Sequence, residues 1–168
     1  MAEKIGWELF RDEYKAALEK GDDVGTAIAD SYDIAITTAV PLLGGGTQGG
    51  QGSAAVPGIV VKAPLKKLMA AMLNQCLKSP FPFPPFSVAL DTALKIYWLG
   101  AVTSNMCVVV NPGVTSAFID AEGMTNKSVD DFIDQLIKAF DNHLKQVQGV
   151  GVPLGTVPTM FVGYKIPG

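Results

Sequence analysis

Apolar residues recur at every third or fourth position in five stretches of the chain, with polar residues between them. This spacing is typical of amphipathic helices, because 3.6 residues make one turn and such positions share one face. The pattern predicts helices over about residues 3–20, from 22 or 23 to 40, 64–78, 88–104 and 129–147. In the third, one wide apolar face is formed by Leu65, Leu68, Met69, Met72, Leu73, Cys76 and Leu77.

Residues that start or stop helices stand at several of these boundaries. Gly21 is expected to end the first helix, because glycine readily adopts the left-handed conformation found after helix ends. Asp22 or Asp23 is expected to cap the second helix by accepting its free amide hydrogens. Ser128, followed three residues later by Asp131, resembles a capping box for the last helix.

Two segments favour β-structure. Residues 107–119 contain two β-prone runs on either side of Asn111-Pro112-Gly113, which favours a tight turn and so predicts a hairpin. Residues 159–166 predict a strand that pairs with this hairpin. The expected fold class is therefore mainly α, about five helices, with a small antiparallel β hairpin or sheet near the C-terminal half; α+β is the alternative.

The chain of 168 residues is expected to form a single domain, 1–168. Within it, the glycine-rich stretch 44–58 predicts a flexible loop. The last part, 148–168, is apolar and interrupted by glycine and proline, and it is expected to form an arm that docks on its own subunit or on a neighbour.

Composition narrows the class of protein. Apolar residues make up 48% of the chain and charged residues 17%, and the net charge is −3. Because soluble domains carry about 25% charged residues, this chain either buries much of its surface against partners or touches a membrane. The balance of charge argues against a nucleic-acid partner. A spanning helix over 89–110 would bury Asp91 and Lys95, so we do not expect a membrane-spanning helix, and a membrane is not the favoured partner.

The chain offers little catalytic chemistry. Cys76 and Cys107 lack the spacing of a zinc site and are expected to be buried thiols. His143 is the one histidine and is expected to be structural or solvated. Residues 44–49 match a dinucleotide-binding glycine pattern by chance, since no strand is predicted before them and no helix after them. We therefore expect no enzyme, no metal and no cofactor.

Aromatic residues are densest around the proline-rich segment 80–86 and the helix that follows it. They are expected either to pack in the core or to form a subunit interface, where aromatic residues are enriched. With the apolar residues of the C-terminal arm, the candidate interface residues are Phe81, Phe83, Phe86, Tyr97, Trp98, Met160, Phe161 and Tyr164.

Several short motifs resemble those of small virion structural proteins from large tailed bacteriophages. They are Trp7, Phe10, Tyr14 and Ala17 before Gly21, then Tyr97-Trp98-Leu99-Gly100-Ala101, Asn111-Pro112-Gly113, Val152-Pro153, Val157-Pro158 and Gly163-Tyr164. The resemblance implies a non-enzymatic component of a tail, neck or baseplate, or a capsid-associated subunit, in several copies per virion. Such a protein is assembled in the host cytoplasm.

Two functional hypotheses follow. The first is a structural subunit that acts by self-association, as a homo-oligomer, and by docking on other virion structural proteins. The alternative is a membrane-active or lipid-binding helical protein, based on the mean hydropathy of +0.28. This alternative would use the lysines around the third helix, which are Lys62, Lys66, Lys67 and Lys78.

Overall fold

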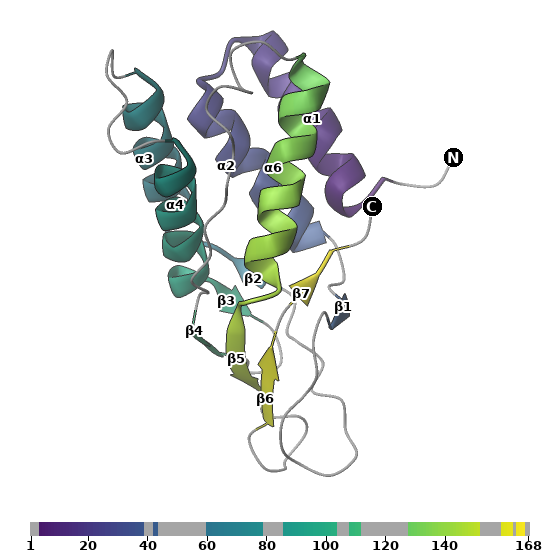
Figure 1. The fold of residues 1–168 in the computed structure, drawn as a ribbon, viewed down its shortest axis with the longest axis vertical. Coiled ribbons are helices and arrows are strands. Elements are labelled where there is room, and N and C mark those ends of the chain that lie inside the picture. Colours follow the sequence, from purple (N-terminus) through teal and green to yellow (C-terminus); the bar gives the residue numbers. More distant parts are fainter. Residues whose placement is uncertain are drawn as a thin grey trace.

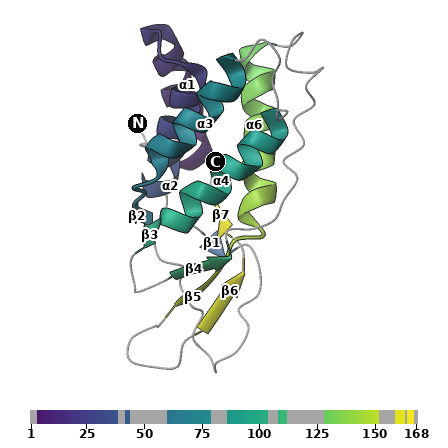
Figure 2. The ribbon, with the colours of Figure 1, turned by 90° about the vertical axis from the view of Figure 1, so that its left-hand side faces the viewer.

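A computed structural model of the chain describes residues 4–38, 42–43, 60–78, 86–103, 108–111, 128–151, 159–162 and 164–166. Five helices lie side by side at one end of the molecule, and short strands gather at the other end (Figures 1 and 2). The helices are α1 (Gly6–Lys20), α2 (Val24–Thr38), α3 (Lys66–Lys78), α4 (Phe86–Gly100) and α6 (Val129–Leu144). The five helices predicted from apolar spacing are thus confirmed, with ends shifted by a few residues.

One hydrophobic core joins all five helices. Its centre is aromatic: Phe140 of α6 stacks on Trp7 of α1 with ring centroids 5.6 Å apart and lies 4.8 Å from Tyr32 of α2. Buried polar ends of these rings are paired, as burial requires. The Trp98 indole N–H donates to the Tyr32 hydroxyl at 2.8 Å, and the Trp7 indole N–H donates to Asp141 Oδ1 at 2.9 Å.

The helix ends follow the sequence in two of three predicted cases. Gly21 ends α1 with φ of 88°, in the left-handed region, as expected. Ser128 Oγ accepts the Asp131 amide at 3.3 Å, which confirms the predicted N-cap of α6. At the start of α2 the Gly25 amide donates instead to Asn74 Oδ1 of α3 at 2.8 Å. The expected cap by Asp22 or Asp23 is thus replaced by a side chain from another helix.

The strands are two to four residues long. β1 (Leu42–Leu43) pairs with β7 (Tyr164–Lys165), and β2 (Val60–Lys62) pairs with β3 (Val102–Thr103), both antiparallel. A third sheet has the order β4 (Val108–Asn111), β5 (Gln148–Gly151) and β6 (Thr159–Val162). Parts of the predicted C-terminal arm therefore pair with their own chain.

The predicted fold class is wrong. In the part of the chain whose side chains the structure describes, 84% of residues are helical. This part contains the five helices but no strand and no sheet, because every strand named above lies outside it. Of the predicted hairpin the structure describes only the first run, which forms β4 and pairs with β5, with Val109 opposite Gly149. Valine runs indicate that a segment is extended but do not select its partner, and here the partner lies far along the chain. Residues 112–120 and the glycine-rich stretch 44–58 lie outside the described part.

Candidate interaction site

The aromatic residues predicted as an interface divide into two groups. Phe86, Tyr97 and Trp98 are buried in the core, so they have no surface to offer a partner. These three residues therefore pack in the core and do not form an interface, because the aromatic face of α4 is turned towards α2 and α6. Phe81 and Phe83 lie outside the described residues, as do the side chains of Met160 and Phe161 in β6 and Tyr164 in β7.

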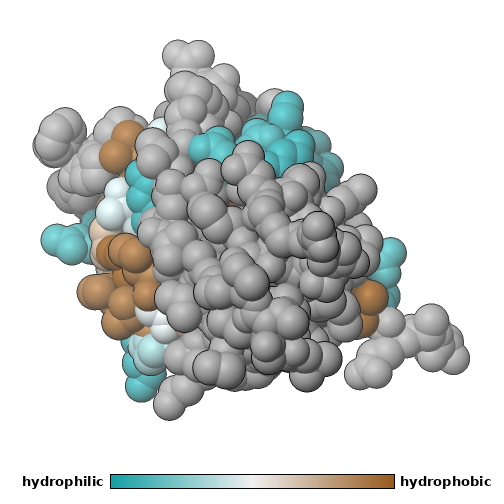
Figure 3. All heavy atoms as spheres, turned by 90° about the horizontal axis from the view of Figure 1, so that it is seen from below, coloured by the Kyte–Doolittle hydropathy of each residue, from teal (hydrophilic) through white to brown (hydrophobic). Residues whose placement is uncertain are grey.

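A different set of apolar residues is exposed where α3 begins and α4 ends. Leu65, Leu68 and Leu99 are 37%, 48% and 61% exposed, and we call these three residues the α3–α4 apolar surface. Seen from below, apolar residues gather on the side of the molecule where α3 and α4 lie (Figure 3). Contiguous apolar patches of this kind mark interaction sites more often than scattered single residues do.

Gly100 allows these two helix ends to approach closely. A Cβ at position 100 would lie 2.6 Å from Leu65 Cγ, so Leu65 occupies the space that a larger residue would fill. The Met69 amide donates to the Leu65 carbonyl at 3.0 Å, which places Leu68 in the same helical turn as Leu65. Leu65 and Leu68 therefore lie one helical turn apart, and Leu65 lies against Gly100, the residue that follows Leu99.

Sequence reasoning missed this surface for a specific reason. Apolar spacing places Leu65 and Leu68 on the wide apolar face of the third helix without separating its buried part from its edge, and it does not single out Leu99. The apolar face of α3 is wider than the contact that α4 and α2 can cover, so its edge remains in solvent. The width of that face was the signal that could have indicated exposed leucines, since an apolar stripe about 100° wide is enough to line a core and this face is wider.

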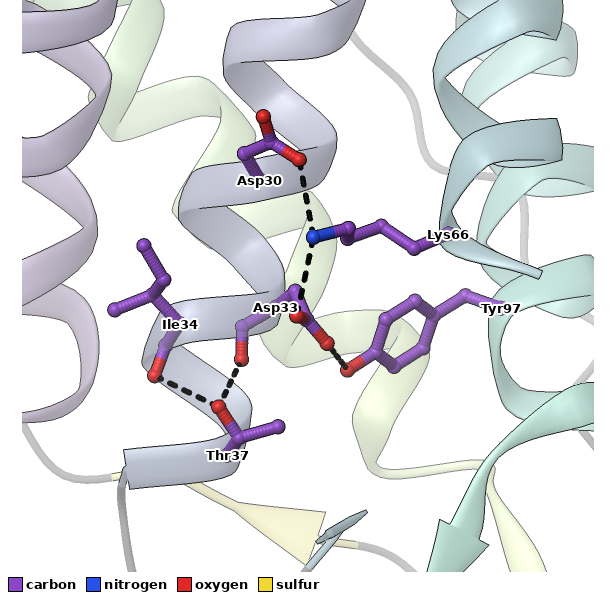
Figure 4. A network of polar contacts seen from close by, with 6 residues as sticks. All are labelled: Asp30, Asp33, Ile34, Thr37, Lys66 and Tyr97. Carbon is purple, nitrogen blue, oxygen red and sulfur yellow. Dashed lines mark hydrogen bonds and ion pairs between the residues drawn. The ribbon is translucent and has the colours of Figure 1, made fainter. Parts of the chain in front are cut away.

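A polar network lies beside the apolar surface and joins three helices (Figure 4). Lys66 Nζ of α3 lies 3.2 Å from Asp30 Oδ1 and 3.5 Å from Asp33 Oδ2, both on α2. The Tyr97 hydroxyl of α4 donates to Asp33 Oδ1 at 2.8 Å. Asp30 and Asp33 thus connect α3 and α4 to α2.

The electrostatics of this network fit a structural tie. Burial is the main cause that raises the pKa of Tyr97 well above its usual value, and the nearby Asp33 carboxylate raises it further. The pKa of Lys66 is also raised: partial burial opposes its charge, but the paired Asp30 and Asp33 carboxylates outweigh that effect. Both groups keep their protons at neutral pH, so Tyr97 stays neutral and Lys66 stays positively charged there.

The remaining sequence candidates lie in the core or outside the described part. Cys76 and His143 are both buried among core residues, and Cys107 lies outside the described residues. Within the described ranges, no group of three or more histidine, cysteine or acidic residues is placed to hold a metal ion. None of the helices described here has the length and apolarity needed to cross a membrane.

Comparisons of the chain with protein-family models, with curated proteins and with solved structures found no match.

Proposed function

We propose that this protein is a non-enzymatic structural subunit of a phage particle that acts by self-association and by docking on other structural proteins. The observation that carries the proposal is the α3–α4 apolar surface, formed by Leu65, Leu68 and Leu99. Only 17% of the residues are charged, so electrostatic repulsion does little to prevent such a surface from associating with another apolar surface.

Burial of the α3–α4 apolar surface supplies the driving force. Full burial of one leucine side chain contributes about 1.5–3 kcal/mol relative to full exposure. These leucines are already partly buried, so each would contribute about half of that on docking. Such a gain is modest for a pair of free molecules, but it suffices in an assembly where several contacts act together.

The assignment to a phage particle is supported by the resemblance carried by Trp7, Phe10, Tyr14 and the Tyr97–Ala101 segment. The lipid-binding alternative receives less support. Lys66 is paired with Asp30 and Asp33, and Lys78 Nζ lies 2.9 Å from Asp23 Oδ2. Two of the four lysines invoked for lipid headgroups are therefore neutralised by aspartates of their own chain.

Light scattering coupled to size-exclusion chromatography tests the self-association. Over protein concentrations from about 1 to about 100 µM, we expect the apparent mass to rise above 17.7 kDa. Leu68→Glu should lower this apparent mass, whereas Ile5→Glu should not, because Ile5 is exposed to a similar extent (44%) on another part of the molecule. A monomer at every concentration, or equal effects of both variants, would contradict self-association through this surface.

Mass spectrometry of purified phage particles tests the second half of the proposal independently. The chain should be present in stoichiometric amounts in particles of the phage that encodes it. Its absence from washed, DNA-filled particles would exclude a structural role in the virion, whatever the purified chain does in solution.

A further inference from the structure

The outer face of α4 carries a stripe of four residues with spacing 4-3-4, which are Val88, Thr92, Lys95 and Leu99. Val88 is 49% exposed, and Leu99 is the most exposed large apolar residue of the described chain. We call these four residues the α4 stripe. Spacing that alternates between three and four residues is that of helices that pack along each other at a shallow angle.

The order of apolar and polar residues along the α4 stripe is the same from either end. An apolar residue stands at each end and a polar residue at each inner position, with equal distances from the centre. A second α4 laid antiparallel would place Leu99 of the second copy opposite Val88, and Lys95 of the second copy opposite Thr92. A twofold axis repeats both pairings, which is the self-complementarity that an isologous interface requires.

Charge favours the antiparallel arrangement over the parallel one. Lys95 Nζ lies 2.8 Å from Asp91 Oδ2 on the same helix, so the centre of the stripe carries no net charge. In an antiparallel pair, each Lys95 also comes next to Asp91 of the second copy. In a parallel pair, Lys95 would face Lys95 of the second copy, and like charges opposite each other are destabilising.

We infer that α4 is the site at which two copies of this chain associate, antiparallel and about a twofold axis. The inference rests on the proposed function and names the partner for one of its contacts. Leu65 lies against Gly100, the residue after Leu99, so the start of α3 can extend the contact beyond α4. The helix has 15 residues and is therefore about 22 Å long, so the contact is smaller than a permanent interface and we expect a dimer in the micromolar range or weaker.

Two single variants test the position of the interface. Val88→Glu and Leu99→Lys should each raise the dissociation constant of the dimer at least about tenfold, because each sets a charge opposite an apolar residue. Val129→Glu is the matched control, since Val129 is also 49% exposed but lies at the start of α6. Sedimentation equilibrium gives the constants, and circular dichroism confirms that each variant is folded. Equal dissociation constants for Val88→Glu, Val129→Glu and the unchanged chain would overturn the inference.

Charge exchange tests the antiparallel direction. The V88E chain mixed with the L99K chain should form a heterodimer, because the new carboxylate of one chain meets the new ammonium group of the other. The double variant V88E/L99K should recover self-association for the same reason. A double variant that associates no better than either single variant would overturn the antiparallel pairing, since a parallel pair sets like charges against each other.

These outcomes separate the inference from the proposed function. If the unchanged chain associates and both Leu68→Glu and Leu99→Lys weaken it, but Val88→Glu has no more effect than Val129→Glu, the inference falls and the proposed function stands. If the α4 variants behave as expected but the chain is absent from phage particles, the dimer stands and the virion role falls.

Discussion

Gly25 sits at a contact that tolerates no side chain. A Cβ there would lie 2.4 Å from Asn74 Oδ1 and 2.6 Å from the Asn74 backbone nitrogen. Gly25→Ala should therefore lower the free energy of unfolding by about 1–3 kcal/mol, because α2 and α3 must move apart. Urea denaturation followed by circular dichroism measures the change.

The partner residue provides a control for this prediction. Asn74→Ala should cost about 1 kcal/mol, through the loss of its hydrogen bonds to the Gly25 amide and the Thr26 hydroxyl. The double variant should remain at least as unstable as Gly25→Ala, since the backbone nitrogen of residue 74 is still in the way. Full rescue by Asn74→Ala would show that the backbone contact is not limiting.

Tyr14 predicts how stability depends on pH. Burial raises the pKa of Tyr14 from about 10 to about 12. Between these values the unfolded chain releases the phenol proton and the folded chain keeps it, so the free energy of unfolding falls as pH rises, by about 1.4 kcal/mol per pH unit for each such group. The contribution is fully present below about pH 10.

Tyr14→Phe isolates this effect from the other groups that titrate in the same range. Between about pH 10 and about pH 12, the free energy of unfolding of the variant should fall less steeply with pH than that of the unchanged chain. The two slopes should differ by about 1.4 kcal/mol per pH unit, which corresponds to one proton. Denaturant titrations at intervals across this range give the slopes. Parallel curves for the two proteins would mean that Tyr14 is ionised as easily in the folded chain as in the unfolded one.

At the scale of elements, the Lys66–Asp33–Tyr97 network predicts energetic coupling between α3 and α4 through α2. Tyr97→Phe should lower the free energy of unfolding by about 1–2 kcal/mol, because it removes a hydrogen bond to a carboxylate. Lys66→Met should cost less, since the pair is partly exposed. In a double-mutant cycle, the coupling energy of the two changes should reach about 0.5 kcal/mol or more.

Lys67→Met is the matched control for this cycle, because Lys67 neighbours Lys66 in the sequence but is exposed. The change in the free energy of unfolding caused by Lys67→Met should add to the change caused by Tyr97→Phe, within experimental error. A coupling of the same size for Lys67 and Lys66 would show that the effect arises from the general charge of α3 and not from the shared Asp33.

The elements that sequence predicted well are those whose signal is local. Helix periodicity and the caps at Gly21 and Ser128 depend on residues a few positions apart, and the structure confirms them. The cap of α2 depends on Asn74, which lies 49 positions from Gly25, and the partner of Val109 is Gly149. Pairings of this kind arise from the packing of whole elements, so no local pattern indicates them.

At the scale of the whole molecule, the same distinction governs the candidate site. Low charge and high apolar content predicted an associating protein, but they did not indicate which apolar residues remain in solvent. Trp98 and Leu99 are neighbours, yet one is fully buried and the other is largely exposed. The difference follows from a rotation of about 100° around the α4 axis, which only the arrangement of the other helices fixes.

The bond from Trp7 to Asp141 has a consequence for how the chain folds. These residues are 134 positions apart, so α1 meets α6 only after α2, α3 and α4 have all been synthesised. Helices α1 to α4 each contact their neighbour in sequence, so their contacts span shorter stretches of chain than the contact between α1 and α6 and are expected to form first. We expect α6 to dock last, with its amides the latest to gain protection in pulse-labelled hydrogen exchange; simultaneous protection of α3 and α6 would contradict this order. Until that step Trp7 and Phe10 lack the cover that Phe140 gives them, and a nascent chain is most prone to aggregation at this stage.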